Sequence, residues 1–155
     1  MLRCPWPISG EKPDEVSLTE EETCDAAVTL YQEENTALHL LPKALTLGVG
    51  CRKGMSQAAL EIAYAALLAE QNFAPEAFVQ AASIDLKANE PGLLAFCTAH
   101  SWELKTYSAE ELSELPGDFT PSPFVAQITG VDNVCERSAV KASGGTLLLP
   151  KTAGG

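Results

Sequence analysis

The sequence lacks the features that would tie it to a membrane, a disulfide framework or a zinc site. Its five cysteines are an odd number, and no two of them have C-x-x-C spacing, which argues against disulfide pairing and against a metal site. Residues 1–7 contain no sustained apolar run, so we expect neither a signal peptide nor a membrane span. We therefore expect a cytoplasmic protein with reduced thiols that binds no metal and no membrane.

Basic residues are also scarce. The chain of 155 residues has 10 lysines and arginines against 21 aspartates and glutamates, a net charge of -11. Residues 1–35 hold nine of the acidic and two of the basic side chains, so this segment is strongly acidic and the remainder only mildly so. Such a balance excludes a general nucleic-acid-binding surface. Any role for basic residues must be local.

Complete nucleotide-binding motifs are missing, although the beginning of one is present. An alternating apolar strand at residues 45–48 runs into a glycine-rich loop. A dinucleotide fingerprint would place its third glycine one residue before Gly54, and a P-loop would end in Gly-Lys followed by Ser or Thr. Here Lys53 precedes Gly54 and Met55 follows it. A nucleotide-binding α/β domain therefore stays an alternative without motif support.

What this loop does contain favours an anion site. Glycines let the backbone approach a ligand closely, and the free N–H groups at the start of the following helix attract negative charge. Arg52 and Lys53 add two full positive charges. The alternative is a tight strand-to-helix turn whose cations are merely solvated. The candidate substrate-binding residues in this loop are Gly48, Gly50, Cys51, Arg52, Lys53, Gly54 and Ser56.

Strand and helix patterns alternate along the rest of the chain, which predicts an α/β fold. We expect a three-layer α-β-α sandwich with a mixed, partly parallel sheet. The predicted strands are residues 45–48, 80–84, 103–107 and a closing strand at 146–149. The predicted helices follow Ser56, Pro75 and Ser108 and cover residues 93–99, 123–129 and 134–142, the last of them capped by Asp132.

A second polar loop follows the strand at 80–84 and contains Asp85, Lys87 and Glu90. Because ligands gather at the carboxyl ends of parallel strands, we expect these side chains beside Arg52. Asp85 and Glu90 are candidate general bases, since a partly buried carboxylate can have a raised pKa. The alternatives are an ion pair of Asp85 with Lys87 and a Glu90 carboxylate that merely stabilises a helix start.

Cys51 and Arg137 each have two interpretations. Nearby cations would lower the pKa of the Cys51 thiol and make a thiolate available, whereas a small buried thiol is the structural alternative. Arg137 would either present its guanidinium to a ligand or pair with its neighbour Glu136. Ser108 and Glu111 match a capping box and need no catalytic role.

The N-terminal segment differs in composition. Its three early prolines and the glutamates at 20–22 favour a flexible or loosely docked arm over about the first 24 residues. Short strands are possible at 28–31 and 38–41. We therefore divide the chain into an acidic N-terminal arm or remnant linker at residues 1–37 and a domain at residues 38–151.

Several motifs in one order resemble the C-terminal domain of the CbiG family, the cobalt-precorrin 5A hydrolases, and the stand-alone CobE-like proteins that share this domain. The resemblance covers about residues 38–151. Its motifs are Gly48-Val-Gly-Cys-Arg-Lys-Gly54 with Ser56, Ser83-Ile-Asp-Leu-Lys87, Asn89-Glu-Pro-Gly-Leu93, Tyr107-Ser-Ala-Glu-Glu-Leu112, Ser122-Pro-Phe-Val125, Gly130-Val-Asp-Asn-Val-Cys-Glu-Arg137 and Ala142-Ser-Gly-Gly145 closing on Leu149-Pro150-Lys151.

This resemblance implies a place in cobalamin biosynthesis. CbiG-like enzymes open the δ-lactone of cobalt-precorrin 5A and release acetaldehyde, giving cobalt-precorrin 5B. The implied ligand is a corrinoid or other tetrapyrrole intermediate. It carries its own cobalt, so the protein requires no cofactor. Implied partners are the hydrolase region that precedes this domain in CbiG-like proteins and other enzymes of vitamin B12 biosynthesis. The alternative is a non-catalytic CobE-like module that holds or passes on the tetrapyrrole.

Overall fold

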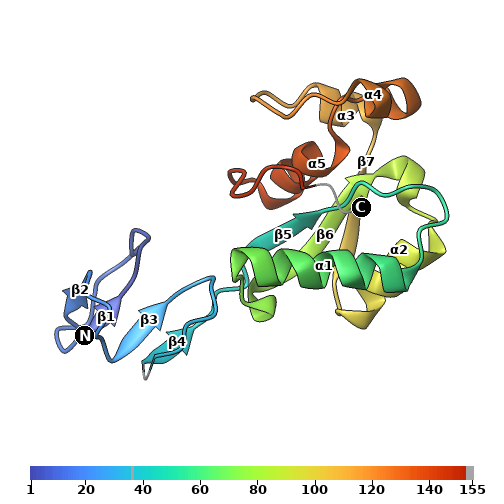
Figure 1. The fold of residues 1–155 in the computed structure, drawn as a ribbon. Coiled ribbons are helices and arrows are strands. Elements are labelled where there is room, and N and C mark those ends of the chain that lie inside the picture. Colours follow the sequence, from blue (N-terminus) through green and yellow to red (C-terminus); the bar gives the residue numbers. More distant parts are fainter. Residues whose placement is uncertain (36, 153–155) are drawn as a thin grey trace. The chain divides into compact units, whose positions relative to one another are not determined.

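A computed structural model describes residues 1–35 and 37–152 (Figure 1). The chain divides into two compact units, which we describe separately. The N-terminal unit comprises Met1–Lys43 and Leu67–Ala77, and the C-terminal unit comprises Ala44–Ala66 and Phe78–Gly155. Among the described residues, no helix is long and apolar enough to cross a membrane.

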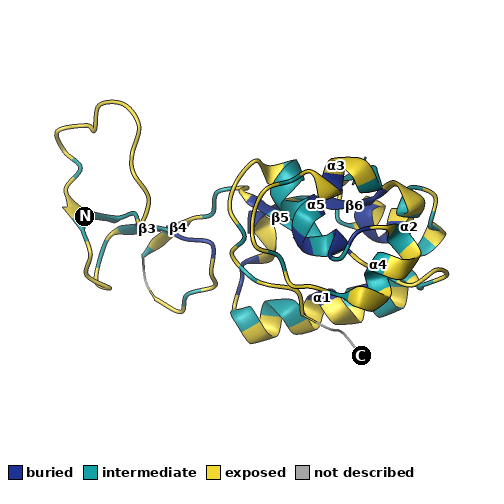
Figure 2. Ribbon diagram, turned by 90° about the horizontal axis from the view of Figure 1, so that it is seen from above, coloured by how far each residue is buried: buried dark blue, intermediate teal, exposed yellow. Residues whose placement is uncertain are grey.

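The C-terminal unit is built on three parallel strands in the order β5-β6-β7. They are β5 (Leu45–Gly48), β6 (Phe78–Ile84) and β7 (Glu103–Tyr107). Five of the seven residues of the central strand β6 are buried, as expected for a parallel strand covered on both faces. In Figure 2 the dark blue of buried residues marks β6 and only part of α5.

Helices lie on both faces of this sheet (Figure 1). On one face lie α1 (Gln57–Gln71) and α2 (Pro91–Ala99), where Tyr64 packs edge-on against Phe78 and Phe96 at centroid distances of 5.4 and 5.9 Å. On the other face, α5 (Val134–Ser143) packs along β5 and β6. The remaining helical segments are η1 (Pro75–Ala77), η2 (Asp85–Lys87), α3 (Ala109–Ser113) and α4 (Pro123–Thr129).

The predicted α/β class and α-β-α sandwich are confirmed by this arrangement. The capping box is also confirmed, because Ser108 Oγ accepts from the Glu111 N–H at 3.2 Å and Glu111 Oε2 accepts from the Ser108 N–H at 2.8 Å. Several elements differ in extent from the prediction. Strand β6 begins at Phe78, and α2 begins at Pro91.

Two predictions at the C-terminal end are wrong. Residues 146–149 form no strand, because the chain beyond Gly144 runs back along α5, where the Lys151 N–H donates to Glu136 Oε1 at 2.7 Å. The cap of α5 is Asn133 rather than Asp132. Its Oδ1 accepts from the Glu136 N–H at 2.8 Å, which leaves the Asp132 carboxylate to bind Arg137.

The N-terminal unit contains a second parallel sheet, of very short strands in the order β2-β1-β3-β4. The first 24 residues, expected to be a loosely docked arm, contribute β1 (Leu2–Arg3) and β2 (Leu18–Thr19). Strand β1 pairs with β2 on one side and with β3 (Ala26–Val28) on the other, and β3 in turn pairs with β4 (Leu38–Leu40). Ion pairs also join Arg3 to Glu33 and the N-terminus to Asp25. The composition of this segment favours disorder, but its strands pair with one another and with β3.

Candidate functional site

The predicted site loop begins where β5 ends. Its base is fixed to the central strand, because the Val49 N–H donates to the Ala82 carbonyl at 2.8 Å and Ser83 Oγ donates to the Val49 carbonyl at 2.6 Å. The loop then turns at Gly54, whose φ of 75° favours glycine. Ser56 Oγ accepts from the Ala59 N–H at 3.2 Å and caps the first turn of α1 as predicted.

The starts of two helices meet at this loop. A Cβ on Gly92, in the first turn of α2, would lie 2.0 Å from the Met55 carbonyl oxygen, so only glycine allows the two backbones to approach so closely. The N-terminal ends of α1 and α2, each with a partial positive charge, are therefore side by side. This is the arrangement expected at the carboxyl ends of parallel strands.

Glu90 and Lys87 lie beside the glycine loop, as the sequence predicted. Glu90 Oε2 accepts from the Gly54 N–H at 3.0 Å, and Glu90 Oε1 lies 3.6 Å from Lys87 Nζ. The hydrogen bond from Gly54, aided by the positive charges of Lys87 and Lys53, lowers the pKa of the Glu90 carboxyl. The predicted rise in pKa is therefore wrong for Glu90, and its geometry fits the alternative interpretation of a fixed carboxylate at a helix start.

Asp85 lies at the start of η2 with an exposed side chain. Its backbone carbonyl accepts from the Ala88 N–H at 3.0 Å. The expected pair of Asp85 with Lys87 is replaced by the pair of Lys87 with Glu90. Because Asp85 is exposed, it lacks the partly buried environment that was expected for a general base.

Arg52 and Lys53 are both exposed. In the described part of the chain, neither side chain makes a hydrogen bond or ion pair. This exposure is what the alternative of a solvated turn requires. It also leaves both cations available to a ligand that lies against the surface of the protein rather than inside it.

The thiol of Cys51 does not have the predicted character. Burial raises the pKa of Cys51, and the charge of Lys87 opposes this rise without reversing it. The prediction of a lowered pKa is wrong because the side chain is half buried, and desolvation of the thiolate exceeds the attraction of the nearby cation. At neutral pH Cys51 is a neutral thiol.

Two of the predicted glycines serve different purposes. A Cβ on Gly48 would lie 1.9 Å from the Cys135 carbonyl oxygen and 2.9 Å from the Ala139 Cβ, so Gly48 is required for α5 to pack on β5. A Cβ on Gly50 would meet the Cys135 Cβ at an ordinary 3.8 Å. Gly48 therefore has a packing role, and the signal was present in the sequence, since glycine inside a strand indicates a close backbone approach.

Arg137 is engaged away from the loop. Its Nε donates to Asp132 Oδ1 at 2.9 Å, and its Nη1 donates to the carbonyls of Leu112 and Leu115 at 3.1 and 3.2 Å. The guanidinium also lies over the Phe119 ring, 4.5 Å from its centroid. These contacts fix the end of α3 against α5. The structure therefore does not bring Arg137 together with Arg52.

The predicted pair of Arg137 with Glu136 is wrong, and Glu136 has a role that sequence reasoning missed. Its carboxylate is buried and accepts from the Thr120 N–H at 2.9 Å and from the Lys151 N–H at 2.7 Å. Burial raises the pKa of Glu136, but these two hydrogen bonds outweigh burial, and the pKa lies below its usual value of 4.5. Asn133 Nδ2 also donates to the Thr120 carbonyl at 3.0 Å. Glu136 and Asn133 together therefore fix the segments around Thr120 and Lys151 to α5.

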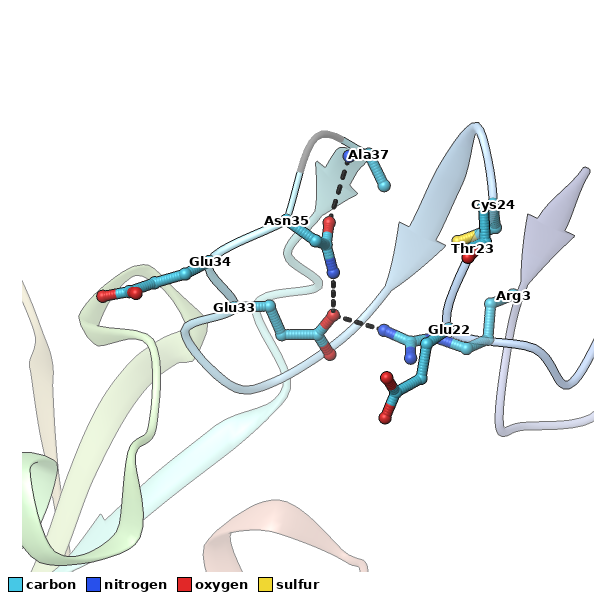
Figure 3. A pocket seen from close by; sticks show the side chains of 8 residues that line it. All are labelled: Arg3, Glu22, Thr23, Cys24, Glu33, Glu34, Asn35 and Ala37. Carbon is cyan, nitrogen blue, oxygen red and sulfur yellow. Dashed lines mark hydrogen bonds and ion pairs between the residues drawn. The ribbon is translucent and has the colours of Figure 1, made fainter.

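A hollow of about 520 Å³ lies in the N-terminal unit (Figure 3). The Arg3 guanidinium is paired with Glu33 inside it, and Asn35 Nδ2 donates to the same Glu33 oxygen at 2.9 Å. Three glutamates make this hollow acidic, so it would repel a carboxylate ligand. The hollow is lined by Arg3, Glu22, Thr23, Cys24, Glu33, Glu34, Asn35 and Ala37, and by none of the predicted site residues.

No group of three or more His, Cys, Asp or Glu side chains within residues 1–35 and 37–152 is arranged to hold a metal ion. Neither Cys51 nor Cys135 has the low pKa of a metal-binding thiolate, because burial raises the pKa of both. The candidate site consists of the basic loop, two helix starts and the Lys87–Glu90 pair.

Two curated relatives are cobalt-precorrin-5A hydrolases. The chain is 37% identical over 123 residues to the cobalt-precorrin-5A hydrolase of Priestia megaterium, covering 79% of this chain and 32% of that protein. It is 34% identical over 109 residues to the cobalt-precorrin-5A hydrolase of Salmonella typhimurium, covering 70% of this chain and 31% of that one. The chain thus spans about a third of the length of these relatives.

Solved structures agree with this relationship. The structure of CobE, a protein from the cobalamin (vitamin B12) biosynthetic pathway, has a TM-score of 0.64 and 28% identity, covering 71% of this chain and 82% of that chain. A cobalamin biosynthesis protein G homologue from Sulfolobus solfataricus has a TM-score of 0.53 and 16% identity, covering 92% of this chain and 43% of that one. This second similarity concerns the fold alone.

The family model described as cobalamin synthesis G C-terminus matches residues 45–155. The matched range includes β5, the basic loop, both helix starts and the Asn133–Glu136 cap. The predicted resemblance is thereby confirmed. This chain belongs to the family formed by the C-terminal domain of the cobalamin biosynthesis protein G.

Proposed function

We propose that this chain is the substrate-binding part of a cobalt-precorrin-5A hydrolase, which opens the δ-lactone of its substrate and releases acetaldehyde to give cobalt-precorrin 5B. The observation that carries this proposal is the exposed pair Arg52 and Lys53 at the meeting point of two helix starts. The similarity to two curated hydrolases supplies the reaction. In this role the protein needs no cofactor, since cobalt belongs to the substrate.

The chemistry of the loop suits such a ligand. A corrin precursor carries several acetate and propionate carboxylates around its ring, and arginine binds a carboxylate through two parallel hydrogen bonds. The exposed Arg52 and Lys53 reach such groups at the rim of a macrocycle. The N–H groups at the starts of α1 and α2 add partial positive charge. The uncrowded Gly50 leaves room for the ligand to approach the backbone.

Lactone hydrolysis also needs an activated water and donors for the oxyanion. Glu90 has a lowered pKa and is already bound to the Gly54 N–H, and Asp85 is exposed. Both are weak candidates for the base. We therefore propose that the hydrolytic groups come from the region of the hydrolase that this chain does not span. We also propose that this chain and that region act in the cytoplasm.

A non-catalytic module like CobE is the second candidate. It is favoured by the structural similarity to CobE, of which this chain covers 82% at 28% identity. Such a module would hold a tetrapyrrole intermediate or pass it to another enzyme of the pathway through the same basic loop. The two candidates differ in whether acetaldehyde is formed.

An anaerobic assay with cobalt-precorrin 5A separates them. We expect no acetaldehyde from this chain alone, and release once the N-terminal region of the Priestia megaterium relative is added. Tight binding without release under either condition would favour the CobE-like module. Thermal stabilisation by nucleotides, with none by the tetrapyrrole, would instead support a nucleotide-binding domain.

A direct titration tests the loop. Arg52→Ala is expected to weaken tetrapyrrole affinity by about tenfold, the effect of losing one charged hydrogen-bonding group. It should leave the melting temperature unchanged, because an exposed charge contributes little to stability. Lys105→Ala, on β7, is the matched control and should bind as the wild type does. Equal affinities for both variants would exclude Arg52 as a clamp.

A further inference from the structure

One face of the sheet in the N-terminal unit is apolar across all four strands. Neighbouring residues in register on parallel strands point to the same side of a sheet. Leu2 is in register with Leu18 and Ala26, and on the outer strand Leu38 is in register with Ala26 and Leu40 with Val28. We call this face, made of Leu2, Leu18, Ala26, Val28, Leu38 and Leu40, the leucine face.

The leucine face is uncovered at both of its outer strands. Leu18 on β2 is 56% exposed, and Leu38 and Leu40 on β4 are 64% and 45% exposed. The opposite face differs, since it carries Arg3, Thr19 and His39 and a fully buried Ala27. The sheet is therefore polar or packed on one side and exposes leucines on the other.

Parallel sheets are normally covered by helices on both faces. In this unit the connections from β1 to β2, β2 to β3 and β3 to β4 contain no helix in their described residues. The chain itself therefore supplies no helix from these connections for the leucine face. Contiguous exposed apolar surface of this kind marks a site of association.

We propose that the leucine face binds an apolar helix from the region of the hydrolase that this chain does not span. This inference rests on the proposed function, which supplies the identity of that region. About two thirds of each curated relative lies outside the matched part. The fold similarity to the Sulfolobus homologue extends over 92% of this chain, which is more than residues 44–155 alone could account for. It covers 43% of the homologue, which is a longer protein. The similarity therefore includes part of the N-terminal unit and lies inside a larger protein.

Charge selects this occupant over a second copy of the chain. Residues 1–35 carry nine acidic and two basic side chains, so two leucine faces from identical chains would bring like charges together. A partner helix with basic residues at its margins would meet the opposite charge.

The test measures association of the full chain with the separately produced region of the Priestia megaterium hydrolase that it does not match. Leu38→Gln with Leu40→Gln removes the exposed apolar side chains without adding charge. We expect the double variant to bind this region about tenfold or more weakly, since buried apolar anchors dominate such interfaces. Ile62→Gln is the matched control, because Ile62 is 72% exposed but lies on α1. It should bind as the wild type does.

Other outcomes would overturn the proposal. They are absence of association, equal affinity of the double variant and the wild type, and a dimer of the chain alone that the double variant dissociates. Tetrapyrrole affinity, measured on the same variants, separates this proposal from the proposed function. The double variant should keep that affinity, whereas Arg52→Ala should weaken it by about tenfold and still bind the hydrolase region. Association through the leucine face without any tetrapyrrole binding would leave this inference standing and remove the proposed function.

Discussion

The two sheets of this chain are both parallel, yet they are built differently. In the C-terminal unit helices cover both faces of the sheet, and five of the seven residues of β6 are buried. In the N-terminal unit loops connect strands of two or three residues, and both leucines of β4 are exposed. The comparison teaches that the sheet of one unit is covered on both faces, while the sheet of the other exposes leucines on its outer strands.

The largest effect should come from breaking the packing of the C-terminal unit at Gly48. A valine there would place its Cβ 1.9 Å from the Cys135 carbonyl oxygen. We expect Gly48→Val to lower the free energy of unfolding by about 3 kcal/mol or more, because backbone has to move. Urea denaturation measures this change. Gly50→Ala is the matched control and should alter the free energy of unfolding little. Equal free energies of unfolding for the two variants would contradict the packing role of Gly48.

A smaller loss is expected from Glu136→Gln. The amide oxygen can replace one carboxylate oxygen, but the NH₂ group then faces a backbone N–H donor and leaves it unsatisfied. We expect a cost of about 2 kcal/mol. Because the pKa of Glu136 is lowered in the folded protein, its stabilisation is present above its usual value of 4.5 and is lost as the pH falls through the lower folded pKa.

Denaturation measured against pH tests this directly. The wild type should lose stability below about pH 4.5, the usual pKa of this group. Glu136→Gln should have a lower free energy of unfolding than the wild type at neutral pH, and should lose less of it as the pH falls. An equal loss for the two proteins on acidification would show that the carboxylate is not the group responsible.

Glu90→Gln should have a modest effect on the assembled hydrolase. Glu90 is a fixed carboxylate with a lowered pKa, so we expect acetaldehyde release to fall by less than about tenfold with an unchanged pH profile. A general base would instead contribute about a hundredfold or more. Glu111→Gln, in the capping box of α3, is the control for loss of an exposed helix-start carboxylate. A hundredfold loss with an altered pH profile at position 90 alone would restore Glu90 as the base.

The smallest effect is expected from Leu40→Gln in the isolated chain. The side chain is 45% exposed on an edge strand, so the free energy of unfolding should change by less than about 0.5 kcal/mol. Leu112→Ala is the contrasting variant, because Leu112 is fully buried, and it should cost about 3 kcal/mol. Similar costs for the two would show that the leucine face is already covered within the chain.

Much of the C-terminal unit was predictable because its signals are local. Alternation identified the strands that became β5 and β7, and Ser108 with Glu111 identified a capping box from spacing alone. The placement of Glu90 beside the basic loop followed from a general rule for parallel sheets. The closing strand at 146–149 failed because an apolar run predicts burial or pairing without saying which partner it meets.

The errors at the site share another cause. The pKa values of Cys51 and Glu90 moved in directions opposite to those predicted, because each depends on burial and on hydrogen bonds from residues distant in the sequence. Arg137 pairs with Asp132 and two carbonyl groups of α3 and the residues after it, rather than with its neighbour Glu136. Residues adjacent in the sequence of a helix point in different directions, so adjacency is a poor guide to pairing.

The sequence alone determined the alternation of strands and helices, the acidic N-terminal segment, the basic glycine loop and the family resemblance. Each of these depends on residue types at short spacing. Only the tertiary structure decided which carboxylates accept backbone hydrogen bonds and which glycine allows a helix to pack closely on a strand. It also decided which face of the second sheet exposes its leucines. These depend on distances between segments far apart in the chain, because burial, hydrogen bonds and pKa values arise only when such segments are brought together.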